Sequence, residues 1–180
     1  MKRLTFLIVF IFLGNMLFAQ KMMTRTGQIK FEASVPSFDP VAAVNNSVSA
    51  ILDESNGEIA VLALVKAFKF KIPLMEEHFN ENYMESSQYP KATFKGRITN
   101  FDASKLSSSQ KYDLEGDLTI HGVTKKIKTK ISLISKEGKV YVSNNLIVKA
   151  QDFNIKIPSV VKSKVAEDVS INLDLILDEK

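Results

Sequence analysis

The chain has no cysteine among its 180 residues. This absence excludes a disulfide framework, a thiol nucleophile and a cysteine-ligated metal site. It also excludes acylation of a cysteine behind a signal peptide. The fold must therefore be held together by its own hydrophobic core, and a chain of this length is expected to form one domain with a substantial core.

Histidine is almost as scarce, since His78 and His121 are the only two. A catalytic base near neutral pH or a histidine metal ligand would have to come from this pair. The chain also lacks a Gly-x-Ser-x-Gly elbow, a glycine-rich phosphate loop and a His-Glu-x-x-His run. We therefore expect no enzyme activity, no catalytic residue, no metal and no cofactor, and we expect both histidines to form structural hydrogen bonds in a turn and a helix.

No stretch clusters basic with aromatic residues, as a nucleic-acid-binding surface would. The formal charge of +4 falls to +2 when residues 1–19 are removed, because Lys2 and Arg3 are lost and no acid is. Lys126, Lys128 and Lys130 alternate with other residues, which indicates a solvated strand face. Nucleic acid is therefore not an expected partner.

One apolar run stands at the N-terminus, from Leu4 to Phe18, between Met1-Lys2-Arg3 and Ala19-Gln20. This pattern is typical of a signal peptide, here residues 1–19, followed by a domain over residues 20–180. A membrane anchor is the alternative, but a spanning helix needs about 20 apolar residues. We expect an exported protein, periplasmic or secreted, with no stable membrane span after cleavage. Residues 4–18 should make few contacts with the domain.

From residue 26 onward, apolar residues recur mostly at every second position, the period of strands with one buried face. The candidate strands are residues 28–35, 47–53, 58–72, 92–99, 112–121, 123–133, 140–148 and 171–177. In 58–72 the alternation is disturbed at Lys66, where we expect a bulge or a charge at a strand edge. Residues 35–46 lack clean periodicity and are expected to form a loop or lid.

Residues 73–84 are the exception, because Met75, Phe79 and Tyr83 recur every four residues. This spacing predicts a short amphipathic helix with Pro73 near its first turn. Turn residues predict tight hairpins at Asn56-Gly57 and at residues 136–139. Gly96 and Gly116 fall on inward-facing positions of their strands, where a missing side chain relieves crowding.

Together these features predict an all-β fold, an eight-stranded antiparallel lipocalin-like barrel with one short helix. A two-sheet sandwich is the alternative. An outer-membrane barrel is rejected, because the outward positions hold Lys, Asp, Glu and Thr rather than apolar residues. Eight strands are enough to enclose one small ligand.

Two motifs follow one another in the middle of the chain. The first is Met75-Glu76-Glu77-His78-Phe79-Asn80-Glu81-Asn82-Tyr83-Met84-Glu85-Ser86 followed by Tyr89-Pro90-Lys91-Ala92-Thr93-Phe94-Lys95-Gly96. The second is Tyr112-Asp113-Leu114-Glu115-Gly116-Asp117-Leu118-Thr119-Ile120-His121-Gly122-Val123-Thr124. These two motifs, in this order, resemble those of the YceI-like family. The resemblance implies an exported eight-stranded barrel that can hold a polyisoprenoid chain along its axis.

An apolar lipid is therefore the expected partner, in the form of a polyisoprenoid, a quinone or a fatty-acid-like molecule. Burial of hydrocarbon contributes about 25 cal/mol per Å², so a long tail needs no specific polar contact. Its head should stay at the barrel mouth, near residues 35–46 and the helix that carries His78 and Tyr83. The expected ligand-binding residues, for which core packing is the alternative, are Phe70, Met75, Phe79, Tyr83, Phe94, Tyr112, Leu114, Leu118, Ile131, Val142, Leu146 and Phe153.

A second hypothesis is an interaction or scaffold protein whose barrel is filled by its own side chains. It rests on departures from the family. The chain has no tryptophan, whereas the family's N-terminal strand usually carries one, together with an Asp-to-His-Ser pattern that is also missing. Residues 58–72 also lack the family's glycine-led pattern. The pattern leaves the oligomeric state open.

Overall fold

The computed structural model describes residues 21–36 and 38–179. The predicted signal peptide and its cleavage site lie outside these residues, and so do the expected few contacts of residues 4–18. No helix within the described ranges is long and apolar enough to cross a membrane.

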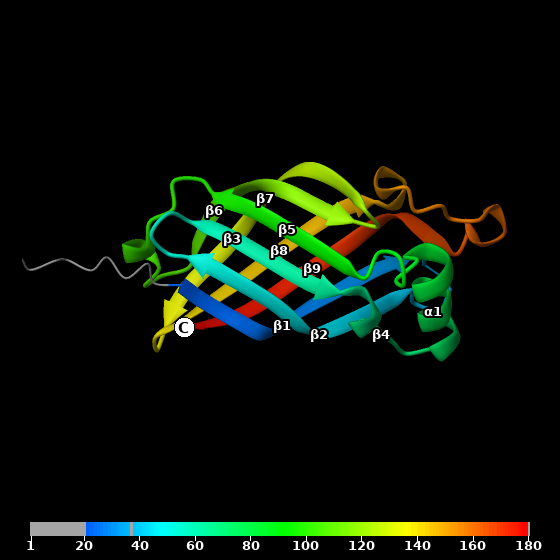
Figure 1. Cartoon of the computed structure of the whole chain (residues 1–180), viewed down its shortest axis with the longest axis horizontal. Coiled ribbons are helices and arrows are strands. Elements are labelled where there is room, and N and C mark those ends of the chain that lie inside the picture. The colour runs from blue at the N-terminus through cyan, green and yellow to red at the C-terminus, as the bar shows by residue number, and fades with distance from the viewer. Residues whose placement is uncertain (1–20, 37, 180) are drawn as a thin grey trace, which may run out of the picture.

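Eight long antiparallel strands form a closed barrel, as predicted (Figure 1). They are β1 (Lys21–Ser34), β2 (Ala42–Asp53), β3 (Glu58–Leu64), β5 (Lys91–Ile98), β6 (Gln110–Ile120), β7 (Val123–Lys136), β8 (Lys139–Lys149) and β9 (Val165–Glu179). Neighbours pair in the order β1-β9-β8-β7-β6-β5-β3-β2, and β1 also pairs with β2, which closes the ring. A two-residue strand, β4 (Lys69–Phe70), pairs with the start of β2.

The predicted helix covers one end of the barrel (Figure 1). It consists of α1 (Pro73–His78), with Pro at its start, and a π-helical continuation, η2 (Phe79–Tyr83). Short 3₁₀ turns lie between other elements, namely η1 (Val65–Ala67), η3 (Ala103–Lys105), η4 (Ala150–Phe153) and η5 (Ser159–Val161).

The first two strands begin earlier than the alternation predicts, because a bulge reverses the alternation in each. In β1, Met22 and Thr24 face inward, but after the register shift between Thr24 and Gly27 the inward face passes to Gly27 and the odd-numbered positions. In β2, the inward face changes from Asn45 to Val48. A bulge inserts one residue and so exchanges the two faces of a strand. Residues 42–46 are therefore strand, and the prediction of a loop or lid over all of 35–46 was wrong. Likewise β9 starts at Val165, before the predicted 171.

The irregular segment 58–72 also differs from the prediction. Strand β3 buries Ile59, Val61 and Ala63, and leaves Leu64 exposed. The chain then turns through η1 rather than through a bulge near Lys66. This turn lets the segment leave the β3 ladder and return as β4.

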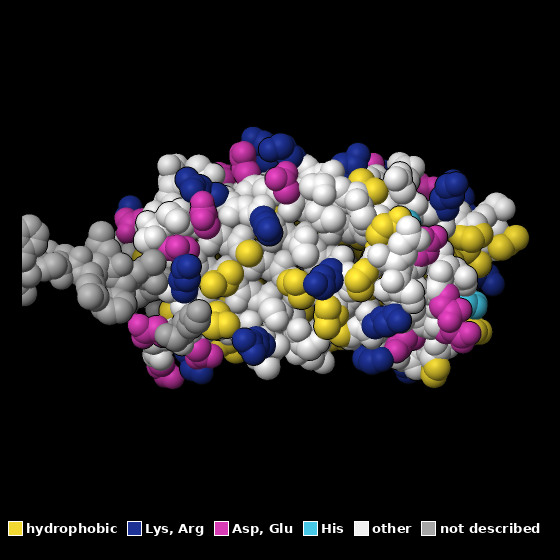
Figure 2. Space-filling view, viewed as in Figure 1, with side chains coloured by type: hydrophobic (Ala, Val, Ile, Leu, Met, Phe, Trp, Pro, Cys, Tyr) yellow, Lys and Arg dark blue, Asp and Glu magenta, His cyan; other side chains and the backbone are white. Residues whose placement is uncertain are grey.

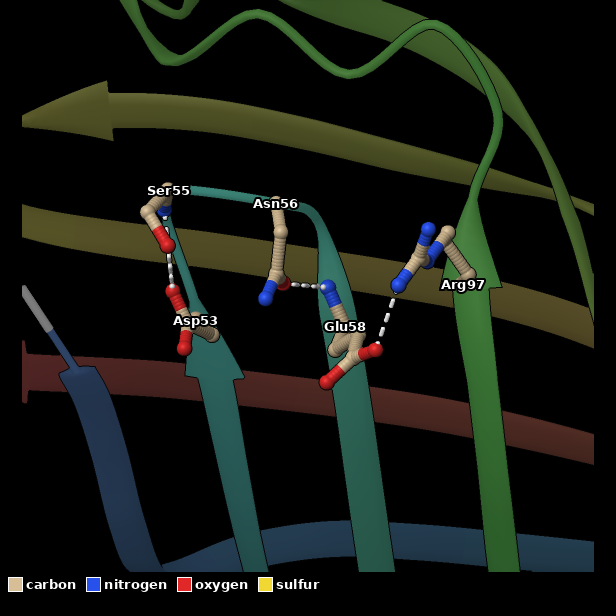
Figure 3. Close-up of polar contacts among 5 residues, drawn as sticks. All are labelled: Asp53, Ser55, Asn56, Glu58 and Arg97. Atoms are coloured by element: carbon tan, nitrogen blue, oxygen red, sulfur yellow. Dashed lines mark hydrogen bonds and ion pairs between the residues drawn. The ribbon is translucent and has the colours of Figure 1, made fainter. Parts of the chain in front are cut away.

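The hairpins close with the residues that the sequence indicated. In the β2–β3 turn, the Asp53 carboxylate accepts hydrogen bonds from the Ser55 backbone N–H (3.0 Å) and hydroxyl, which lower the pKa of Asp53. Asn56 Oδ1 accepts from the Glu58 N–H at 2.8 Å, and the Arg97 guanidinium pairs with the Glu58 carboxylate across the strands (Figure 3). Such local contacts favour one register of the hairpin.

The outer face of the barrel is charged with both signs mixed (Figure 2). On β6 and β7 the charges form a cross-strand ladder, Lys126 to Asp117, Lys128 to Glu115 and Lys130 to Asp113. These pairs are exposed, so each contributes little to stability. The predicted solvated face of β7 is confirmed.

Candidate functional site

The inward-facing apolar residues form two groups along the barrel. At the end with the β2–β3 and β7–β8 hairpins, which we call the packed end, Leu52, Leu133 and Leu177 are at most 1% exposed. Leu106, from the β5–β6 connection, closes this end and is also buried. At the opposite end, under α1, inward residues keep part of their surface exposed to solvent; they are Ile29, Phe31, Leu146, Val148, Ile171 and Leu173. Because several of its inward residues are only partly buried, we call this second end the open end.

A cluster of four phenylalanines lies beneath α1 at the open end. It joins Phe31 of β1, Phe68 and Phe70 around β4, and Phe79 of η2. Ring centroids lie 5.1 to 5.9 Å apart, and the Phe31 and Phe79 rings stack at 5.2 Å. Large apolar rings with some exposure form a surface on which hydrocarbon can be buried.

Phe94 lies across the inner wall of the barrel, over two glycines. Gly96 and Gly116 pair directly between β5 and β6. A Cβ atom at either glycine would lie about 2.5 Å from the Phe94 ring, 2.5 Å at Gly96 and 2.6 Å at Gly116. The predicted relief of crowding is therefore confirmed, and the space is needed both by the backbone of the paired strand and by the Phe94 ring.

The predicted ligand-binding residues are divided between these regions. On inward strand faces lie Phe94, Tyr112, Leu114, Leu118, Ile131, Val142 and Leu146. Of these, Leu114, Ile131 and Val142 belong to the tightly buried core, and the Tyr112 hydroxyl donates to the Asp102 carbonyl at the packed end. Phe70 and Phe79 belong to the aromatic cluster. Met75 and Tyr83 are half-buried on α1 and η2, and Phe153 is buried in η4. A binding role for each stays a prediction.

Sequence reasoning missed several open-end residues. Phe31 and Phe68 contribute as much to the aromatic cluster as the predicted Phe70 and Phe79 do. Both are aromatic residues in segments predicted as strands, so an aromatic at an inward position was the available signal. In β1 that signal was present, since Phe31 alternates regularly with Ile29 and Ala33 after the bulge.

The ladder between β7 and β8 is incomplete at the open end, where η4 packs against both strands. Their pairing stops at Ile131 and Asn144, and within the described strands β7 pairs only with β6 before that point. The Asn144 amide spans the start of the gap, since it donates to the carbonyl of Lys130 at 2.6 Å and to the Thr129 hydroxyl at 3.0 Å. Beyond it, the half-buried side chains of Ile127 and Leu146 lie on inward faces of the two diverging strands.

His121 ties three segments together next to this gap. It occupies the β6–β7 turn with φ of 51°. Its Nδ1 lies 3.1 Å from the Phe153 carbonyl oxygen, which can only accept, so Nδ1 carries a proton. Its Nε2 lies 3.6 Å from a Glu85 carboxylate oxygen, and its ring packs edge-on against Tyr89. The structural role predicted for His121 is confirmed. His78 is exposed on α1, and its predicted hydrogen bond is not seen among the described residues.

Glu76 fastens α1 to the aromatic cluster. One carboxylate oxygen pairs with Lys69 Nζ at 2.5 Å and the other accepts from the Phe70 N–H at 3.2 Å. The hydrogen bond from Lys69, followed by that from Phe70, lowers the pKa of Glu76. These contacts hold β4 against the first turn of the helix.

We predict that acid releases this contact. Because the folded-state pKa of Glu76 is lowered, its stabilisation is complete above the unfolded pKa of about 4.3 and is lost as the pH falls through the folded value. Glu76→Gln should accelerate hydrogen exchange of the Phe70 amide at pH 7, whereas the unaltered protein should show this only below about pH 4. The matched control is Glu77→Gln, at an exposed neighbouring position. Equal acceleration in both variants would contradict the role of Glu76.

Two surface hollows, of about 430 and 510 Å³, lie near the packed end. The first is lined largely by outward residues of β7, β8 and β9, including Tyr141 and Ile176. The second lies between Asp53, Lys95 and Glu115. Among the predicted ligand-binding residues, only Val142 lines either one. The hollows therefore do not coincide with the open-end interior.

The family model of the YceI-like domain matches residues 17–177, so the chain belongs to this family. A polyisoprenoid binding domain from Saccharophagus degradans, implicated in plant cell wall breakdown, has a TM-score of 0.77 at 16% identity, covering 90% of this chain and 99% of that one. Burkholderia cenocepacia BcnA gives 0.69 at 20% identity, covering 83% and 95%. The Campylobacter jejuni YceI protein gives 0.64 at 18% identity, covering 81% and 88%. A search of curated proteins gave no match. At these identities the structures establish the shared fold.

Proposed function

We propose that this protein is a non-catalytic binding protein that holds a long apolar lipid in the open half of its barrel. The observation that carries the proposal is the set of inward apolar residues that remain half-buried at the open end, Leu146, Ile171 and Leu173 among them. An inward apolar residue that keeps exposed surface gains free energy when hydrocarbon covers it, at about 25 cal/mol per Å². The fold shared with the polyisoprenoid binding domain from Saccharophagus degradans supports the same assignment.

The geometry suggests how such a lipid would lie. The packed end is closed by fully buried leucines, so the tail enters from the open end and extends toward Phe94. The phenylalanine cluster covers the tail from the α1 side. The polar head stays outside, near α1 and the β8–β9 connection. Export to the periplasm or beyond, with residues 1–19 as the signal peptide, is part of this proposal.

A barrel filled by its own side chains is the second candidate function, that of an interaction or scaffold protein. The packed end favours it, because there the side chains fill the interior without a ligand. The two candidates make opposite statements about the open end. Lipid binding requires that lipid contacts Leu146, whereas the scaffold function requires that only protein and water contact it.

The test uses adjacent residues of β8 that point to opposite faces. Leu146 is inward and half-buried, whereas Ile147 is outward and 63% exposed. Native mass spectrometry of protein from its own cell envelope should show bound lipid in the unaltered chain and in Ile147→Glu. The bound lipid should be lost in Leu146→Glu, because a carboxylate in the path of the tail must be desolvated. No bound lipid, and no uptake of isoprenoid quinone or fatty acid, would refute lipid binding and leave the scaffold function.

A further inference from the structure

Three segments far apart in the sequence each present an exposed apolar side chain at the open end. They are Phe38 in the β1–β2 connection, Leu74 in α1 and Val160 in η5. Val160 is 83% exposed, and it lies in the β8–β9 connection, which projects beyond the barrel as the orange segment in Figure 1. Figure 2 shows hydrophobic side chains at this tip, with basic and acidic side chains near them.

The β8–β9 connection is basic, whereas Asp39 lies beside Phe38 in the β1–β2 connection. Residues 150–164 contain Lys156, Lys162 and Lys164 against a single acid, Asp152. Lys162 pairs with Glu167 at 2.9 Å, whereas Lys156 and Lys164 form no ion pair within the described part of the chain. Lys164 Nζ instead lies 5.9 Å from the centroid of the Phe38 ring. Apolar tips and unneutralised lysines therefore occur together, on two connections that touch.

We propose that the open end docks on the surface of an anionic lipid bilayer, with Val160 inserted among the lipids and Lys156 and Lys164 against their head groups. An apolar residue flanked by lysines is suited to this interface, where each basic residue near the surface strengthens binding about fivefold. The apolar residues project from separate segments, and both surface hollows lie near the packed end. A soft, planar, negatively charged surface fits such separate projections.

Docking in this orientation places the half-buried inward residues of the open end next to the bilayer. A lipid tail could then pass between membrane and barrel without crossing water, which is unfavourable for hydrocarbon. This purpose rests on the proposed function, but the docking itself does not. Lys21, the first described residue, lies at the packed end, whereas Val160 lies at the open end.

The chain has no tryptophan, so a single introduced one reports its own surroundings. Val160→Trp places that reporter at the tip. Ile176→Trp is the matched control, since Ile176 is exposed by 48% on the outer face of β9 at the packed end. With phosphatidylglycerol vesicles, the emission of Val160→Trp should shift to the blue and be quenched by brominated lipid, and that of Ile176→Trp should not change. Phosphatidylcholine vesicles should produce little shift in either.

The lysines are tested in the Val160→Trp background. Adding Lys156→Gln and Lys164→Gln should weaken vesicle binding by about fivefold for each lysine removed, and added salt should do the same. An unchanged Val160→Trp spectrum, an equal shift in Ile176→Trp, or equal binding to phosphatidylcholine would overturn the proposal. Docking is read from fluorescence and lipid occupancy from native mass spectrometry. A tip that inserts while the barrel stays empty therefore refutes the proposed function alone.

Discussion

Gly116→Ala is expected to destabilise the protein by about 3 kcal/mol or more, at or above the upper end of the usual cost of overpacking. The new Cβ would lie 2.5 Å from the Cα of Gly96 and 2.6 Å from the Phe94 ring, and closer still to the Lys95 carbonyl oxygen. Two of these three neighbours are backbone atoms of a paired strand, which cannot move without breaking the β5–β6 ladder. We therefore expect the variant to be largely insoluble or to unfold at much lower urea concentration.

Gly138→Ala is the matched control for this prediction. Gly138 has φ of +74° and nothing within 4 Å of its would-be Cβ, so only its backbone conformation resists the change. That cost is about 1 kcal/mol. Adding Phe94→Leu to Gly116→Ala should restore only part of the stability, because the backbone contacts remain. Equal urea midpoints for the two glycine variants would show that the wall can yield at Gly116.

Ile131→Ala is expected to cost about 2 to 5 kcal/mol, the range for removing a fully buried aliphatic side chain. Ile131 is completely buried in the core cluster, where its neighbours cannot collapse into the space it would leave. Leu146→Ala should cost only about 1 kcal/mol, because that side chain is already partly exposed. Urea unfolding of the two variants measures the difference.

These two variants also separate core packing from ligand contact. Both residues were predicted to bind the ligand, and both face inward. Leu146→Ala should bind lipid more weakly with little loss of stability, whereas Ile131→Ala should lose stability and keep whatever lipid the folded fraction holds. If Leu146→Ala proves as destabilising as Ile131→Ala, the open end is packed as tightly as the packed end. The proposal that lipid binds at the open end is then refuted.

The barrel could be predicted from the sequence because most strands alternate cleanly. In β7, Ile127, Ile131 and Leu133 fall on one side and lysines on the other, and the structure pairs those lysines with the acids of β6. The helix was equally plain, since its four-residue period differs from that of every strand around it. In such segments one physical cause, a single buried face, produces both the pattern and the fold.

Prediction failed in segments where a bulge interrupts the alternation of buried and exposed residues. The bulges of β1 and β2 exchange faces in mid-strand, so the alternation of residues 21–27 and 42–46 cannot be seen without knowing that Gly27 lies opposite Val48. In the candidate site, too, the alternation alone does not show which inward residues are only half-buried. Leu146 and Val142 have the same parity on β8, yet one is half-buried and the other buried. That difference depends on where β7 separates from β8, which is a property of the assembled barrel.

The closure of the ring has a consequence for how the chain acquires its fold. Met22 lies opposite Leu52 on one side and Glu179 on the other, so the first described strand is completed by the last. This seam joins residues separated by almost the whole domain, and contacts of such long sequence separation form slowly because a large loop must be closed first. During synthesis, β1 can pair with β2 early but must wait for β9. Removal of the whole of β9 would therefore open the wall between β1 and β8, whereas loss of a few C-terminal residues would remove only its pairs at the packed end.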